Sequence, residues 1–226
     1  MRPFTDSEKT LASQLFSLGA VQFGSFTLKL HEKFPDAPKS PIYLNLRDNK
    51  NPKEGKLNPE CYRRAGLAMM RLAATKSLRY DLVIGLPNAG TPFAEAFASL
   101  LLGKPEDHLF DLKKEEKDGK RRIITDQVGE KLKGKRCLLI DDLISGADTK
   151  LEAKQALEEL GAKVTDILVL VDRCQGGTET MAEQGVRTHA VFTLPDLVSY
   201  YVENASIEQE QEQKVLNYLR RQLTGT

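Results

Sequence analysis

Short apolar runs alternate with amphipathic stretches through the second half of this chain. Runs at 81–85, 136–141 and 164–171 have the length of buried strands, and helical spacing of apolar residues follows each, at 93–102, 149–160 and 178–184. Strands that alternate with helices predict a mainly parallel sheet joined by right-handed crossovers. We therefore predict an α/β fold in which helices flank a mainly parallel central sheet.

The flanking segments show the same two patterns. Residues 6–18 place leucines on one helical stripe, and alternation at 21–28 and 42–46 predicts two strands separated by a polar insertion between Leu30 and Lys39. A helix start at 58–60, a strand at 191–194, a short helix at 197–202 and a terminal helix over about 205–226 complete the prediction. Because no linker is visible, we predict one domain, 1–226, in which residues 1–50 contribute an N-terminal helix and a small hood.

Composition narrows the classes of partner. Lys and Arg number 33 against 32 Asp and Glu, so a net charge of +1 gives no reason to expect binding to nucleic acid or an anionic membrane. The 3 cysteines are far apart, which indicates a reduced compartment and neither a disulfide framework nor a zinc site. The first residues lack the apolar core of a signal peptide, and no apolar run reaches membrane-spanning length. We therefore expect a cytoplasmic protein that does not bind to or span a membrane.

The stretch from Lys135 to Thr149 carries the clearest chemistry. An apolar strand leads into Asp141 and Asp142, and a turn of small residues then opens a helix. Ligands of open α/β sheets bind beyond the carboxyl ends of parallel strands. Backbone N–H groups at a helix start can hold a phosphate, and carboxylates can accept hydrogen bonds from vicinal hydroxyls, so the stretch suits a ribose 5-phosphate. The pattern also fits an ordinary strand-to-helix loop with solvated aspartates.

Two further segments lie between predicted elements. The turn at 85–92 contains Gly85 and Gly90, whose backbone could approach an anion closely. The segment 112–120 is highly charged and contains Gly119, which predicts a mobile surface loop. Without other information, a charge run of this kind is usually a solvated face.

Several of these stretches resemble one known family. Residues 135–149 resemble the diphosphoribosyl-binding signature of type I phosphoribosyltransferases, in which a hydrophobic strand leads into two acidic residues and a Thr/Gly-rich turn. Residues 22–29 and 40–47 resemble the N-terminal signature of orotate phosphoribosyltransferases, 112–120 their catalytic loop, and 171–177 their Asp-Arg-x-x-Gly element. The resemblance implies the type I phosphoribosyltransferase fold with a small N-terminal hood. It also implies transfer of phosphoribosyl from phosphoribosyl diphosphate to orotate, giving orotidine monophosphate and pyrophosphate in pyrimidine (UMP) biosynthesis.

The resemblance assigns roles to individual residues. The implied catalytic residues are Lys117, Asp118, Asp141 and Asp142. Asp141 and Asp142 would hold the ribose hydroxyls and stabilise the developing positive charge, while Lys117 receives the leaving pyrophosphate. Arg173 would pair with the carboxylate of orotate. The implied substrate-binding residues are Lys29, Tyr43, Leu44, Lys113, Lys114, Ser145, Gly146, Thr149 and Arg173.

The resemblance also implies a cofactor and an assembly. Mg²⁺ would be carried by the diphosphate of the substrate, so no metal-binding residues are expected in the protein. The partners would be the small molecules orotate and phosphoribosyl diphosphate. A homodimer with shared active sites is implied, in which the charged loop of one subunit closes over the site of its neighbour.

One turn departs from the family pattern. Most members have Thr, a small residue, Gly, and then Ser or Thr, where this chain reads Ser145-Gly146-Ala147-Asp148-Thr149. Without a gap, Ala147 replaces the glycine and Asp148 lies near the phosphate. A shorter loop would instead let Gly146 serve as the glycine and Asp148 cap the following helix. The altered turn keeps an alternative function open, that of a catalytically weak or inactive phosphoribosyltransferase-like protein with a nucleotide-binding or regulatory role.

Overall fold

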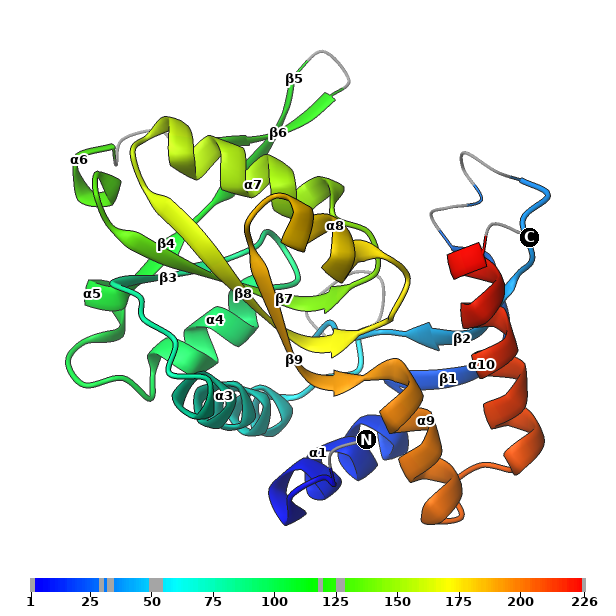
Figure 1. Cartoon of the computed structure of the whole chain (residues 1–226). Helices are drawn as coiled ribbons and strands as arrows, with labels where there is room; N and C mark the ends of the chain where they lie inside the picture. The colour runs from blue at the N-terminus through cyan, green and yellow to red at the C-terminus, as the bar shows by residue number, and fades with distance from the viewer. Residues whose placement is uncertain are drawn as a thin grey trace. The chain divides into compact units, whose positions relative to one another are not determined.

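The computed structural model describes residues 3–28, 31, 35–48, 55–117, 120–124 and 129–224. Contacts between Cα atoms divide the chain into two compact units. One unit consists of Met1–Cys61 and Phe192–Thr226, and the other of Tyr62–Val191. Figure 1 shows the elements of both.

The unit Tyr62–Val191 is built on a five-stranded sheet with the strand order β4-β3-β7-β8-β9 (Figure 1). The pairs β4–β3, β3–β7 and β7–β8 are parallel, as the alternation of strands and helices predicts. The α/β fold with a mainly parallel sheet is therefore confirmed. The strands are β3 (Leu82–Gly85), β4 (Leu109–Asp111), β7 (Arg136–Ile144), β8 (Lys163–Asp172) and β9 (Arg187–Thr193).

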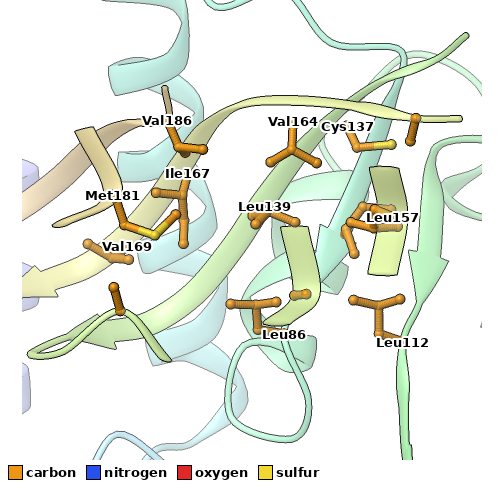
Figure 2. Close-up of a cluster of buried hydrophobic side chains, with 14 of the residues drawn as sticks. Leu86, Leu112, Cys137, Leu139, Leu157, Val164, Ile167, Val169, Met181 and Val186 are labelled. Carbon is orange, nitrogen blue, oxygen red and sulfur yellow. The ribbon is translucent and has the colours of Figure 1, made fainter. Parts of the chain in front are cut away.

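Helices cover both faces of this sheet, with α7 on one face and α4 on the other (Figure 1). Successive side chains of a strand point to opposite faces. On the α7 face, Leu139 of β7 and Ile167 of β8 pack in one buried cluster with Leu157 of α7 and Met181 of α8 (Figure 2). The helices are α3 (Pro59–Thr75), α4 (Thr91–Ala98), α5 (Pro105–His108), α6 (Gly129–Leu132), α7 (Asp148–Glu159) and α8 (Gly177–Glu183).

The other unit joins the two ends of the chain. Its helices are α1 (Asp6–Ser17), α9 (Leu194–Glu203) and α10 (Gln209–Thr224), and β1 (Val21–Phe26) pairs antiparallel with β2 (Ser40–Leu44). Thr5 and Glu8 form a capping box at the start of α1. The hydroxyl of Tyr201 on α9 donates to the carbonyl of Ala12 on α1, 2.9 Å away. The predicted strand pair is confirmed, and its service as a hood over the base stays a prediction.

Two segments differ from the sequence-based expectations. The strand expected to end at Asp141 continues to Ile144, so both aspartates lie within β7. The charged segment expected to be an irregular loop contains β5 (Lys113–Lys117), which pairs antiparallel with β6 (Lys120–Ile124). An Asp-Gly pair stands between these strands in the sequence, which is a common signal for a two-residue hairpin.

Two expectations concern the environment of the chain. None of the helices in the described residues is long and apolar enough to cross a membrane. The three cysteines are all described, and each is a free thiol.

Candidate active site

The carboxyl ends of three neighbouring strands form the candidate site. Gly85, the last residue of β3, is in register with Ile140 of β7, and Ile144 at the end of β7 is in register with Asp172 at the end of β8. The backbone N–H of Arg173 donates to the carbonyl of Ile144 over 2.9 Å. The parallel sheet therefore brings the acidic pair of β7 and the Asp-Arg pair of β8 to one edge, where ligands of such sheets bind.

The turn after β3 lies against the end of β7. The N–H of Leu86 donates to the carbonyl of Ile140 over 2.9 Å, and the Pro87–Asn88 peptide bond is cis. A Cβ added at Gly90 would lie 2.4 Å from the carbonyl oxygen of Ile140 and 2.9 Å from the Cα of Asp141. Only glycine fits at this close approach of two backbones.

The two aspartates of β7 have different surroundings. Asp141 is 7% exposed, and its Oδ2 lies 2.5 Å from Nζ of Lys150 on α7. Its Oδ1 accepts a hydrogen bond from the N–H of Asp142 at 2.9 Å. Asp142 is less buried, and its Oδ1 accepts from the N–H of Leu143 at 2.8 Å. Burial and the charge of Asp141 raise the pKa of Asp142 above its ordinary value, against the opposing effect of Lys150.

The turn after β7 leads directly into α7. Ala147 occupies the N-cap with φ −103° and ψ −12°, in the right-handed region, so alanine carries no backbone strain there. Asp148 is the first residue of the helix and is exposed, so the alternative in which Asp148 caps α7 is wrong. Ser145 and Thr149 are half-buried on either side of the exposed Gly146. Because the alanine side chain cannot accept a hydrogen bond, it leaves the first N–H groups of α7 to other acceptors.

The turn after β8, which contains Arg173, is stabilised by hydrogen bonds to Asp172. One oxygen of Asp172 accepts from the N–H of Cys174 and the other from the hydroxyl of Thr178, both at 2.7 Å. Cys174 has φ 54°, which is uncommon for a residue with a side chain and is found more often at functional sites. Arg173 itself is 5% exposed. The residue therefore lies in a turn whose shape is stabilised by local hydrogen bonds.

The remaining predicted site residues fall into two groups. Tyr43 and Leu44 lie on β2 of the other unit, where Leu44 is buried and Tyr43 is half-buried with its ring 5.6 Å from that of Phe26. The backbones of Lys113, Lys114 and Lys117 form β5. Lys29 and Asp118 lie outside the described residues. The structure thus brings together Asp141, Asp142, Ser145, Gly146, Thr149 and Arg173.

Sequence reasoning missed one member of the site, Lys150. A signal was present, because Lys150, Ala153 and Leu157 share the buried stripe of α7 at helical spacing. A lysine on such a stripe is rare without a charged partner. The partner, Asp141, precedes it by nine residues on the strand that leads into the helix.

Comparison with known proteins defines the class first. A family model for the phosphoribosyl transferase domain matches residues 62–187, which lie within the unit Tyr62–Val191. The fold is that of a type I phosphoribosyltransferase. The chain is thus a member of the phosphoribosyltransferase family.

Individual relatives define the family more closely. Orotate phosphoribosyltransferase of Rhodopseudomonas palustris is 30% identical over 164 residues, which cover 71% of this chain and 83% of that protein. The chain belongs to the orotate phosphoribosyltransferase family. Uridine 5'-monophosphate synthase of Bos taurus is 28% identical over 93% of this chain, which spans only 40% of that protein. The structure of Leishmania donovani UMP synthase superposes with a TM-score of 0.73 at 28% identity, covering 95% of this chain and 42% of that one.

Proposed function

We propose that this chain transfers the phosphoribosyl group of phosphoribosyl diphosphate to orotate, giving orotidine monophosphate and pyrophosphate in pyrimidine nucleotide biosynthesis. The observation that carries the proposal is the meeting, at one sheet edge, of the acidic pair of β7, the start of α7 and Arg173. A carboxylate pair suits ribose hydroxyls, a helix start suits a 5′-phosphate, and a guanidinium suits the carboxylate of the base. Orotate phosphoribosyltransferases among its relatives support the choice of base.

The reaction places specific demands on these residues. The bond between the ribose C1 and the diphosphate oxygen breaks while a base nitrogen forms a bond to C1, so positive charge develops on the sugar. The acidic pair of β7 provides negative charge beside that sugar, and preorganised charge of this kind is a large source of rate enhancement. The turn from Ser145 to Thr149 would hold the 5′-phosphate and orient C1 toward the base.

The base and the leaving group are assigned to the other predicted residues. Arg173 would select orotate by a bidentate bond to its carboxylate, with Tyr43 and Leu44 lining the base and Lys29 reaching the phosphates. Lys113, Lys114 and Lys117 would neutralise the leaving pyrophosphate, with Asp118 beside them. The antiparallel pairing of β5 with β6 supports a projecting hairpin as the carrier of these lysines.

Magnesium and a shared site complete the proposal. Among the described residues, no cluster of three or more His, Cys, Asp or Glu side chains gathers as metal ligands, so the diphosphate oxygens would have to supply most of the ligands of Mg²⁺. When bound, Mg²⁺ neutralises the diphosphate and so improves it as a leaving group. We further propose a homodimer in which the β5–β6 hairpin serves the partner's site. A cytoplasmic location is supported by the three free thiols.

A direct assay tests the function. Orotate consumption is measured with phosphoribosyl diphosphate and Mg²⁺, and both ligands are titrated by calorimetry. Turnover of orotate is expected. Binding of the nucleotide without turnover would favour the alternative of a weak or inactive phosphoribosyltransferase-like protein, and binding of neither ligand would refute both.

A substitution at Arg173 tests the choice of base. Arg173→Lys keeps the charge but loses the planar fork, so the KM for orotate should rise about tenfold or more while the KM for phosphoribosyl diphosphate changes little. Arg187→Lys is the matched control, because Arg187 is an arginine of β9 whose side chain is 68% exposed. An equal rise in both KM values would argue against a role in base selection.

A further inference from the structure

Lys150 is a buried cation within the candidate site. It lies in the first turn of α7 and is 7% exposed. Its Nζ lies 2.5 Å from Oδ2 of Asp141, and the two side chains are 9% and 10% exposed. Because a lysine is desolvated at such a position, a close carboxylate is what keeps its charge stable. The pair is therefore a fixed part of the fold and not a surface contact.

The pair makes the two aspartates unequal. Both oxygens of Asp141 are engaged, Oδ2 by Lys150 and Oδ1 by the N–H of Asp142. Successive side chains of a strand alternate between its faces. Since Asp141 points toward α7, Asp142 points to the other face of β7, where it is the more exposed of the two.

Two charged groups lie next to Asp141 among the residues whose side chains are described. Lys150 faces it from α7, and Asp142 follows it on β7. Its register partner on β8 is Val169, and the turn after β3 approaches its backbone at Gly90, so neither neighbour brings a charge. Lys150 is thus the group that balances Asp141, and it also opposes the rise in the pKa of Asp142.

We propose that Lys150 is a positioning residue, which fixes Asp141 and cancels its charge so that Asp142 is the carboxylate that binds the ribose hydroxyls. This inference rests on the phosphoribosyl transfer proposed above. Phosphoribosyl diphosphate is a polyanion, and two uncompensated carboxylates would repel it. With Lys150 in place, the site presents one free carboxylate to the sugar and little net charge to the phosphates.

The test compares the two substrates. Lys150→Met removes the charge but keeps an unbranched side chain of similar length. The KM for phosphoribosyl diphosphate should rise about tenfold or more, and more strongly at low ionic strength, while the KM for orotate changes less than about twofold. Lys150→Arg keeps the cation and should return the KM to within about threefold of the wild-type value. A merely structural role would lower the melting temperature without separating the two KM values.

Helix α7 itself offers a matched control. Lys154 lies one turn further along, and its Nζ is 2.5 Å from Oε2 of Glu158, with side-chain exposures of 18% and 39%. Lys154→Met therefore removes an ion pair of the same length from the same helix without touching Asp141. It should leave both KM values unchanged.

A double substitution shows whether Lys150 acts through Asp141. Asp141→Asn combined with Lys150→Met leaves a neutral pair, which also guards against misfolding from an unpaired buried charge. Adding Lys150→Met to Asp141→Asn should change the calorimetric affinity for phosphoribosyl diphosphate less than about twofold. Two results would overturn the inference: a loss of affinity from Lys150→Met that is as large in the Asp141→Asn protein as in the wild type, or an unchanged KM in Lys150→Met alone. If the wild-type protein turned over orotate, the proposed function would still hold in either case. A wild-type protein without turnover or binding would instead remove the function, and the inference with it.

Discussion

Asp141 on β7 and Asp166 on β8 are two buried carboxylates on neighbouring strands, and each needs hydrogen-bond donors or a cation to offset the cost of burying its charge. Asp166 is 4% exposed and accepts hydrogen bonds from Arg187 at 2.9 Å and from His189 and Thr165 at 2.8 Å. Burial alone would raise the pKa of Asp166, but these hydrogen bonds outweigh it, and the pKa lies below its ordinary value. A buried and paired aspartate is therefore not by itself a sign of catalysis.

The difference lies in what stands beside each carboxylate. Asp166 is the fourth residue of β8, within the strand, and three side chains supply its donors. Asp141 lies near the carboxyl end of β7, and a second carboxylate, Asp142, follows it with a raised pKa. A titratable side chain whose pKa is strongly shifted by burial and by a neighbouring charge is typical of a functional site. The comparison predicts that Asp166 serves stability and that the pair of β7 serves function.

The largest expected effect concerns activity. Asp142→Asn should lower kcat/KM about 10²- to 10³-fold, which is the usual loss when one group that stabilises transition-state charge is removed. Asp166→Asn should leave kcat/KM, measured per folded molecule, within about twofold. Steady-state kinetics with the folded fraction checked by circular dichroism would decide. An equal loss in both variants would break the comparison.

The second largest effect is expected from alanine substitutions at two glycines, Gly90 and Gly146, near the carboxyl end of β7. Gly90→Ala places a Cβ within 2.4 to 2.9 Å of backbone atoms of Ile140, Leu86 and Asp141. The end of β7 must then shift, at a cost of up to about 3 kcal/mol and with loss of activity. Gly146→Ala has open space and a backbone outside the left-handed region, so it should be tolerated. Melting temperatures and turnover of both variants provide the measurement.

Substitution of Asp166 should lower the stability of the fold more than substitution of Asp142, which is the reverse of the order expected for activity. Asp166→Asn removes a buried charge and weakens the hydrogen bonds that Arg187, His189 and Thr165 donate to it, so it should lower the free energy of unfolding by about 2 kcal/mol. Urea denaturation at neutral pH measures the loss. Arg187→Gln is the control, since this side chain is 68% exposed and its removal should cost less than about 1 kcal/mol. A stable Asp166→Asn variant would refute the structural role.

The last effect is in the pH dependence of stability, where the two aspartates should have opposite signs. Because the pKa of Asp166 is lowered in the folded state, its contribution is present above the unfolded value of about 4 and is lost as the pH falls through the folded value. Because the pKa of Asp142 is raised, stability declines as the pH rises above about 4. Asp142→Asn should remove that decline, which is at most about 1.4 kcal/mol per pH unit. Urea denaturation between about pH 3 and 8 measures both slopes.

The sequence predicted those parts of the fold that continuous patterns determine. The apolar runs of β7 and β8 are long enough to be recognised, and the helices that follow them have clear stripes. β4 was missed because it is only three residues long, and its place at the sheet edge comes from pairing with β3. The hairpin β5–β6 was missed because its charged composition outweighed the Asp-Gly signal between the strands.

The residues of the candidate site also divide into those that the sequence could predict and those that it could not. Asp141 and Asp142 are adjacent in the sequence and follow a recognisable strand, so they could be found together. Arg173 was placed by resemblance, and the register of β7 with β8 brings it to the same edge. Lys150 could not be assigned, because its role depends on a contact between a strand and the helix that follows it. A sequence pattern shows which face a residue occupies but not which partner it meets there.

The start of α7 has a consequence for the amount of folded protein. Ala147 cannot cap the helix, so a bound phosphate ester would complete its first turn. A ligand that binds only the folded chain stabilises it by mass action, by about 2.7 kcal/mol at a hundredfold excess over its Kd. If the proposed function holds, the folded population would follow the supply of the phosphorylated sugar, and a cell short of that sugar would also lose this protein to proteolysis.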